Sequence, residues 1–299
     1  MFFYRLFIPT LEYTLTVSYD LSMTLSGRNR LVIAGIIWSL LIFIVLGYFS
    51  LKSFSVFPLL EEQAINRPLG ILHSLVALFL KPQSYVPLFS IIISVLYSLI
   101  TIIAIYFLFE KTQSPEILFF ANFVLSLSLE IGRMALPLIT YYDASLSYAV
   151  FTGKIILFSR LFGLFSLFLA SVYAAGMDMQ RYGFLLLLNV AVCLALASGV
   201  PIDSMNWDTA LTPRYGFANM FFFIELTIII ITVASFFISV KNKSSRDYIF
   251  VSLGIFLVIL GRDILLHADT FPELGISIPL LGVGTWMYCV YLHRYYLWL

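Results

Sequence analysis

Residues 31–51 read LVIAGIIWSLLIFIVLGYFSL, an apolar run without a charged side chain. An α-helix needs about 20 consecutive apolar residues to cross the hydrocarbon core of a bilayer. A helix that is apolar on every side does not suit the surface of a water-soluble domain. The run therefore predicts a membrane-spanning helix.

Seven further runs of similar length and apolarity follow. They lie at residues 86–109, 116–139, 153–175, 182–200, 217–240, 248–268 and 276–297. None of them alternates between polar and apolar residues as the strands of a membrane barrel do. The sequence thus predicts an all-α, polytopic bundle of about eight transmembrane helices, in which a signal-anchor-like first helix precedes a seven-helix core at 86–299.

Composition agrees with a chain whose main partner is the lipid bilayer. Hydrophobic residues make up 61% of the chain and charged residues 11%, whereas a soluble domain carries about 25% charged residues. The net charge of +1 provides no basic face for nucleic acid, so no nucleic-acid partner is expected. Cys193 and Cys289 lie in apolar runs without a CxxC spacing, and no metal or other cofactor is expected.

Lysine and arginine in the connections predict the orientation. One side carries nine of them: Arg5, Arg28, Arg30, Lys111, Arg181, Lys241, Lys243, Arg246 and Arg294. The other side carries five: Lys52, Arg67, Lys81, Lys154 and Arg214. Both termini are therefore expected in the cytoplasm, and the run at 241–246 is interpreted as a topology anchor.

Three segments outside the spans have their own predictions. In residues 1–30, apolar and polar residues alternate from Leu11 to Leu25, which indicates either a strand that pairs with a partner or a translation start at Met23. The outer connection at 52–85 contains a short apolar stretch, 68–80, expected to lie along the interface. The loop at 201–216 is interpreted either as a cap over a cavity or as a plain solvated loop.

Ionisable side chains interrupt four of the predicted spans. On insertion scales each costs about 2.5–3.5 kcal/mol at the centre of a span, so such residues persist where they face protein or water and have partners. They are Glu130 and Arg133 in span three, Arg160 in span four, Glu225 in span six, and Arg262, Asp263 and His267 in span seven.

Helix geometry predicts that these charges meet at one level. The helix rises about 1.5 Å per residue. The charged residues that lie roughly 9–13 Å below the predicted outer ends of their spans are Glu130, Arg133, Arg160, Glu225 and Arg262. The charges sum to zero, as expected of a buried cluster in which acids and arginines neutralise one another. The acids are Glu130, Glu225 and Asp263, and the arginines are Arg133, Arg160 and Arg262. Glu130 and Arg133 are three residues apart, and Asp263 and His267 are four apart, so each pair shares a helix face.

These seven residues are therefore predicted to bind a ligand in a polar pocket that opens outward. The planar guanidinium of arginine suits a carboxylate or phosphate, so the expected ligand is anionic or zwitterionic. Two other interpretations stay open. The charges could serve only to lock helices together, or Arg262, Asp263 and His267 could simply lie at the membrane interface.

The end of the chain resembles a known family of sensors. Residues 260–267 read LGRDILLH, 278–288 read IPLLGVGTWMY and 291–296 read YLHRYY. With these stretches, the core at 86–299 resembles the seven-helix sensory modules of bacterial receptor kinases and cyclases. The resemblance implies a sensor in the bacterial cytoplasmic (inner) membrane. Because the chain ends at Leu299 without an output domain, the resemblance also implies either a separate signalling partner or a module that has lost signalling, and it assigns no binding residue.

Three functions follow from these observations. The leading one is a sensory or ligand-binding module with an outward-facing pocket. The second is an enzyme acting on a lipid or lipid-linked phosphate, with the arginines on the phosphate and a carboxylate or His267 as acid or base; no nucleophile or metal motif supports it, and no catalytic residue is assigned. The third is a transporter or a transporter subunit, which needs a polar path through inner halves that hold almost no charge.

Overall fold

The computed structural model describes most of the chain. Its described residues are 25–61, 83, 85–110, 112, 114–176, 182–243 and 245–297. The alternating segment before Leu25, the interfacial helix expected at 68–80, and His73 within it lie outside the described residues.

Eight helices in these ranges are long and apolar enough to cross a membrane, which confirms the all-α bundle of a multi-pass membrane protein. The helical elements are α2 (Leu25–Glu61), α4 (Val86–Phe109), α5 (Pro115–Ser128), η2 (Leu129–Ile131), α6 (Gly132–Tyr141), α7 (Leu146–Ala174), α8 (Tyr182–Gly199), α9 (Ala218–Lys243), α10 (Arg246–His267) and α11 (Phe271–Leu297). The third span is built from α5 and α6, which the short 3₁₀ segment η2 joins.

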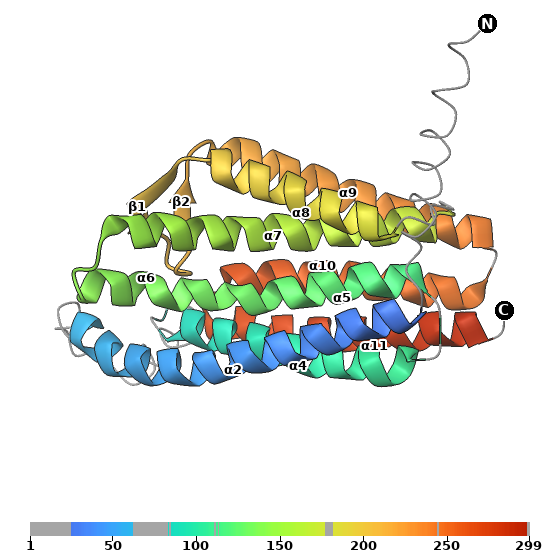
Figure 1. Cartoon of the computed structure of the whole chain (residues 1–299), viewed down its shortest axis with the longest axis horizontal. Helices are drawn as coiled ribbons and strands as arrows, with labels where there is room; N and C mark the ends of the chain where they lie inside the picture. The colour runs from blue at the N-terminus through green and yellow to red at the C-terminus, as the bar shows by residue number, and fades with distance from the viewer. Residues whose placement is uncertain are drawn as a thin grey trace, which may run out of the picture.

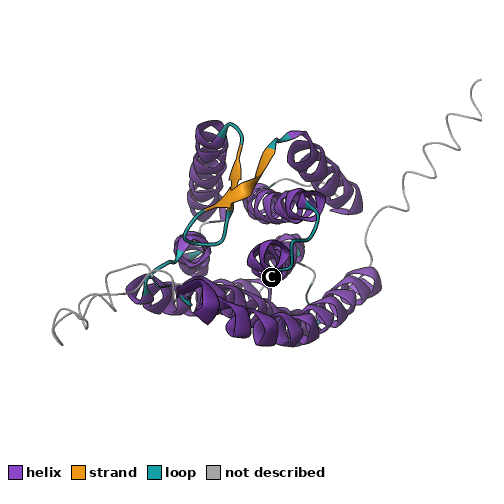
Figure 2. Cartoon of the chain, turned by 90° about the vertical axis from the view of Figure 1, so that its left-hand side faces the viewer, coloured by secondary structure: helices purple, strands orange, loops and turns teal. Residues whose placement is uncertain are grey.

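The helices run side by side along the long axis of the molecule (Figure 1). Leu25 and Leu297 lie at one end, which we call the terminal end. Strands β1 (Ile202–Trp207) and β2 (Pro213–Tyr215) lie at the other, which we call the hairpin end. Figure 2 shows the bundle from the hairpin end, with the strands lying across one side of it.

Three helices extend well beyond the spans that the hydropathy of the sequence predicted. Helix α2 covers Leu25–Glu61 instead of 31–51, α7 begins at Leu146 instead of residue 153, and α11 begins at Phe271 instead of residue 276. Hydropathy marks the part of a helix that suits hydrocarbon, whereas backbone hydrogen bonds let the helix continue beyond it. As a result, α6 and α7 extend past the hairpin-end limits of α9 and α10 (Figure 1).

Burial separates a central set of helices from a peripheral one. The apolar window is 72% buried in the third span, 61% in α7 and 56% in α10, but 17% in both α8 and α9. Helices α10 and α11 pack closely, since a Cβ on Gly254 would lie 2.8 Å from the carbonyl oxygen of Gly284. The third span, α7 and α10 therefore form the centre, and α8 and α9 cover one side of it.

The segment at 201–216 forms an antiparallel hairpin, in which Asp203 lies opposite Arg214. The hairpin packs directly on α7, because a Cβ on Gly153 would lie 3.0 Å from the side chain of Ile202. At its tip, Leu211 has a positive φ of 56° and is buried in an apolar cluster that includes Met134 of α6. A tip held in this way makes the hairpin a folded cover over the bundle, not a solvated loop.

Candidate functional site

A buried glutamate lies between two arginines at the hairpin end of the bundle. Glu130, which is 1% exposed, is 3.5 Å from the guanidinium of Arg133 and 3.4 Å from that of Arg160. It belongs to η2, and a 3₁₀ segment inside a long helix often marks a functional or strained position. The contact with Arg133 confirms the shared helix face expected from their spacing of three residues.

Arg133 fixes the tip of the hairpin. Its Nε donates a hydrogen bond of 3.0 Å to the carbonyl oxygen of Ala210, and its Nη2 donates to the same oxygen. Both groups are buried, and burial makes a charge-assisted hydrogen bond of this kind stronger than it is in water. One guanidinium thus binds both the glutamate of η2 and the backbone of the hairpin.

Arg160 connects four elements of the bundle. From α7, its Nε lies 3.4 Å from Glu130 and its Nη2 donates a 3.0 Å hydrogen bond to the hydroxyl of Thr212 in the hairpin. Its backbone carbonyl oxygen accepts a 3.2 Å hydrogen bond from Arg262 of α10. No described residue accepts a hydrogen bond from its third side-chain nitrogen, Nη1.

The expected pairing of three acids with three arginines is found only around Glu130. Arg262 is buried against α7, but the next residue, Asp263, is 53% exposed and lies 3.8 Å from His267. Consecutive helical residues point about 100° apart, which explains why Arg262 is buried while Asp263 lies at the exposed side of a pocket. Glu225 lines a pocket and forms no ion pair within the described residues.

Counting from helix ends also placed Arg160 too close to the outer end. Because α7 starts at Leu146, Arg160 lies about 20 Å from that end of its helix, not about 10 Å. Its contacts with Glu130, Thr212 and Arg262 nevertheless place these charges together in space. The earlier start of α7 explains the difference, since α7 extends beyond the level where α9 and α10 end (Figure 1).

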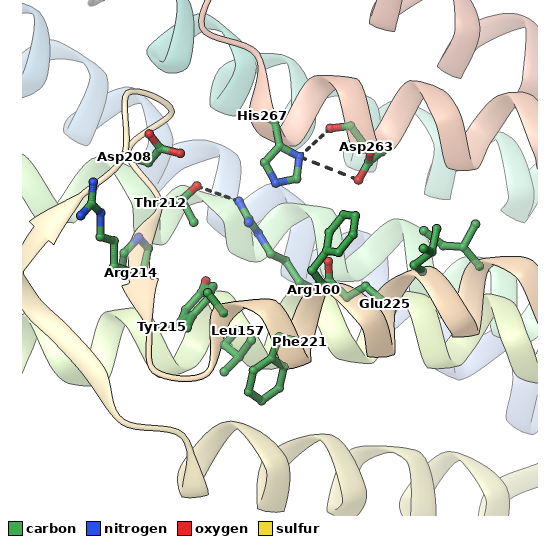
Figure 3. A pocket seen from close by; sticks show the side chains of 15 residues that line it. Leu157, Arg160, Asp208, Thr212, Arg214, Tyr215, Phe221, Glu225, Asp263 and His267 are labelled. Atoms are coloured by element: carbon green, nitrogen blue, oxygen red, sulfur yellow. Dashed lines mark hydrogen bonds and ion pairs between the residues drawn. The ribbon is translucent and has the colours of Figure 1, made fainter.

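A pocket of about 650 Å³ lies beside this cluster, in the range of about 300–1,000 Å³ usual for small-molecule sites. Its walls come from α7, the hairpin, α9 and α10. The lining residues with polar side chains are Arg160, Asp208, Thr212, Arg214, Tyr215, Glu225, Asp263 and His267. Figure 3 shows Asp263 and His267 on α10 facing Arg160 and Glu225 across this space.

The charged side chains of the pocket wall are of both signs. In Figure 3, Arg214, Asp208 and Thr212 lie on one side, and Asp263 and Glu225 lie on the other, with Arg160 reaching toward Thr212. Within its described part, the structure gives the side chains of Arg214 and Glu225 no hydrogen bond or ion pair. Such a wall suits a ligand that carries both a negative and a positive group.

Several buried polar atoms of the site have no hydrogen-bond partner among the described residues. They are the hydroxyl of Tyr215, and Oε2 of Glu130 and Nη1 of Arg133, which face each other in the 3.5 Å ion pair without forming a hydrogen bond. Burial raises the pKa of the Tyr215 phenol to about 12, so the hydroxyl stays protonated at neutral pH and can donate a hydrogen bond. Thr212 and Tyr215 were not predicted from the sequence, since nothing in their spacing distinguishes them from other loop residues.

A second buried glutamate lies at the terminal end. Glu116 of α5 is 1% exposed and forms an ion pair of 3.1 Å with Lys243 of α9. Its carboxylate also accepts hydrogen bonds from the hydroxyls of Ser114, Tyr248 and Tyr296, of which the shortest is 2.7 Å. We call these five residues the Glu116 cluster. Sequence reasoning missed it, because it interpreted Lys243 as a topology anchor and the inner halves of the spans as almost uncharged.

No group of three or more His, Cys, Asp or Glu side chains within the described ranges could hold a metal ion. Cys193 and Cys289 are both buried free thiols. Comparison of the chain with protein-family models, with curated proteins and with solved structures gives no match in any of the three.

Proposed function

We propose that the protein is a membrane ligand-binding module of the sensory type, whose pocket at the hairpin end holds a small anionic or zwitterionic group. The observation that carries this proposal is the position of Arg160 in the pocket wall. Its side chain is 6% exposed, and among the described residues its hydrogen bonds to acceptors come from Nε and Nη2, not from Nη1. A carboxylate or phosphate oxygen of a ligand would supply Nη1 with an acceptor in a charge-assisted hydrogen bond.

The contacts of Arg160 also support a sensory role. The residue contacts η2 through Glu130, the hairpin through Thr212 and α10 through Arg262. A ligand anion that competes for its guanidinium changes the contacts with Glu130 and Thr212 together, while the contact with Arg262 is made by the backbone of Arg160. Such a ligand shifts the bundle between two packing arrangements if it binds one of them better, and a signalling partner would respond to that shift.

The proposed orientation places the hairpin end outside and both termini in the cytoplasm. It is supported by the excess of lysine and arginine in the connections of the terminal end. In a bacterium, this arrangement corresponds to a multi-pass protein of the cytoplasmic membrane with its pocket accessible from the outer side.

The variant Arg160→Lys tests the proposal. Lysine keeps the positive charge, but its ammonium cannot contact Glu130, Thr212 and a ligand together. Thermal unfolding of the purified full chain in amphipol is measured with a panel of carboxylates, phosphates, amino acids and phosphodiesters such as glycerophosphoethanolamine. We expect at least one compound to raise the Tm of the wild type, and Arg160→Lys to weaken its affinity about 10- to 100-fold, the loss expected for one charged hydrogen bond.

Arg246→Lys is the matched control, because Arg246 is exposed at the terminal end. It is expected to respond to the same compound as the wild type does. The proposal fails if no compound stabilises the wild type or if Arg160→Lys responds unchanged. Cleavage of a phosphodiester by the wild type would instead favour the enzyme alternative, for which the contact of 3.8 Å between His267 and Asp263 offers an acid–base group.

A further inference from the structure

The pocket continues along α9 beyond its charged part. Phe222, Leu226 and Ile229 line it, at spacings of four and three residues. Residues with these spacings form one stripe along a helix face. The stripe begins beside the hairpin, shares its helix face with Glu225, and extends toward the terminal end, so that Leu226 and Ile229 form an apolar extension beyond the charged part of the pocket.

The exposure of the lining residues shows where the pocket opens. Phe222 is 61% exposed and Leu226 is 40% exposed on α9, while Asp263 and His267 are 53% and 55% exposed on α10. Residues that both line a pocket and reach the molecular surface form its rim. The rim therefore runs between α9 and α10, along the side of the bundle.

The hairpin covers the pocket from the end of the bundle. Thr212 and Pro213 line the pocket and are buried, and Thr212 is held by Arg160. A route from the end would have to displace these contacts, whereas the side opening requires no such change. In a membrane, that side opening faces lipid.

The depth of the apolar stripe matches one leaflet of a bilayer. Ile229 lies about 17 Å along α9 from Ala218, the first residue of the helix. The hydrocarbon core of a bilayer is about 30 Å thick, so with the first residue of α9 at the interface the stripe reaches about to the midplane. An acyl chain that enters from one leaflet has this depth available to it.

Resting on the proposed function, we propose that the ligand is a phospholipid with a zwitterionic headgroup, which enters from the bilayer between α9 and α10. The phosphate binds the guanidinium of Arg160, and the amine of the headgroup binds near Glu225 and Asp263. One acyl chain lies along Phe222, Leu226 and Ile229. A soluble zwitterion of the same headgroup chemistry, which lacks the chain, is the other possible source of this ligand.

Two compounds separate these sources. Dihexanoyl-phosphatidylethanolamine carries the headgroup and short acyl chains, and glycerophosphoethanolamine carries the headgroup alone. The affinity of each for the full chain in amphipol is measured from the ligand dependence of thermal unfolding. We expect the wild type to bind the acylated compound at least about tenfold more tightly than the headgroup.

Leu226→Asn places a polar group in the apolar stripe and is expected to weaken binding of the acylated compound about tenfold without affecting the headgroup. Ile230→Asn is the control, since Ile230 is 59% exposed on the same helix and does not line the pocket. It should leave both affinities unchanged. If Leu226→Asn folds poorly, Leu226→Ala replaces it. Leu226→Ala is expected to weaken binding of the acylated compound in the same direction but by a smaller factor.

Equal affinities for the two compounds, together with no effect at Leu226, would overturn the lipid proposal and leave a soluble zwitterion as the ligand of the proposed pocket. Equal losses in Leu226→Asn and Ile230→Asn would also overturn it, since the effect would not belong to the stripe. Binding of neither compound would overturn the lipid proposal together with the zwitterionic form of the proposed function.

Discussion

The two ends of the bundle each bury a glutamate, but they surround it differently. At the terminal end, Glu116 accepts hydrogen bonds from a serine, two tyrosines and Lys243. The Lys243 ammonium also lies 4.4 Å from the centre of the Tyr248 ring. At the hairpin end, Glu130 forms ion pairs with two arginines, through Oε1 at 3.4 Å and through Oε2 at 3.5 Å, and the Oε2 contact is not a hydrogen bond.

This difference indicates that the Glu116 cluster holds helices together, whereas the hairpin end is suited to bind a ligand. A buried polar group is expensive unless it is paired, and the Glu116 cluster pairs its groups with one another across α5, α9, α10 and α11. The hairpin end has more positive than negative charge in direct contact, and the neighbouring pocket holds unpaired polar groups. Among its five described residues, the Glu116 cluster therefore has no free polar group for a ligand to bind, whereas a ligand at the hairpin end would supply partners to polar groups of the pocket.

The largest expected effect comes from Glu130→Gln. This change leaves the buried guanidinium groups of Arg133 and Arg160 without their shared counter-charge. Removing one partner of a buried ion pair typically costs about 3–5 kcal/mol, and we expect a loss of this size in the free energy of unfolding. Reversible unfolding in mixed detergent measures it.

Glu225→Gln is the matched control for that experiment. Glu225 lines the pocket, is partly exposed and forms no ion pair within the described residues. Its charge lies near Arg160 and Arg262 but is partly exposed to water, so its substitution should cost about 1 kcal/mol or less in the free energy of unfolding, well below the loss in Glu130→Gln. Equal losses in the two variants would show that Glu130 is not the structural centre of the cluster.

Glu116→Gln should have a smaller effect. The amide oxygen still accepts hydrogen bonds from the tyrosine hydroxyls, and Lys243 keeps its contacts with the aromatic rings. What is lost is the charged part of these bonds, so we expect about 1.5–3 kcal/mol in the free energy of unfolding. Affinity for the compound found with the wild type should stay the same.

That second readout distinguishes the two ends. A change in ligand affinity of more than about tenfold in Glu116→Gln would show that the Glu116 cluster takes part in ligand binding through the length of α9. The view of this cluster as a passive lock would then be wrong, and α9 would be the helix that connects the two ends.

The sequence predicted the parts of this comparison that depend on local spacing. Eight apolar runs predicted eight helices, and spacings of three and four predicted the contacts of Glu130 with Arg133 and of Asp263 with His267. Helical periodicity brings such residues together whatever the tertiary packing is.

Contacts between distant residues could not be predicted in this way. Glu116 lies 127 residues from Lys243 and 180 from Tyr296, so no periodicity connects them. Thr212 meets Arg160 only because the hairpin folds back over α7. The prediction that the buried charges neutralise one another only counted acids and arginines. It could not show that Glu130 pairs with two arginines while Asp263 pairs with His267.

Tyr215→Phe should have the smallest effect on stability and a clear one on binding. The buried Tyr215 hydroxyl has no hydrogen-bond partner among the described residues, so its removal should change the free energy of unfolding by about 1 kcal/mol or less at neutral pH. If the hydroxyl donates to the ligand anion, the same change weakens binding about tenfold. Opposite behaviour, a large loss of stability with unchanged binding, would assign Tyr215 to the structural part of the hairpin.

The pH dependence of stability provides an independent check of Tyr215. Burial raises its pKa from 10.0 to about 12, so the folded state favours the neutral phenol. The resulting contribution to stability is fully present below pH 10 and is lost as the pH rises toward 12. Between these values the wild type should lose more stability than Tyr215→Phe does, as measured by unfolding at fixed temperature. Identical slopes would mean that the phenol is as accessible to water in the folded protein as in the unfolded one, and the hairpin would then not seal the pocket.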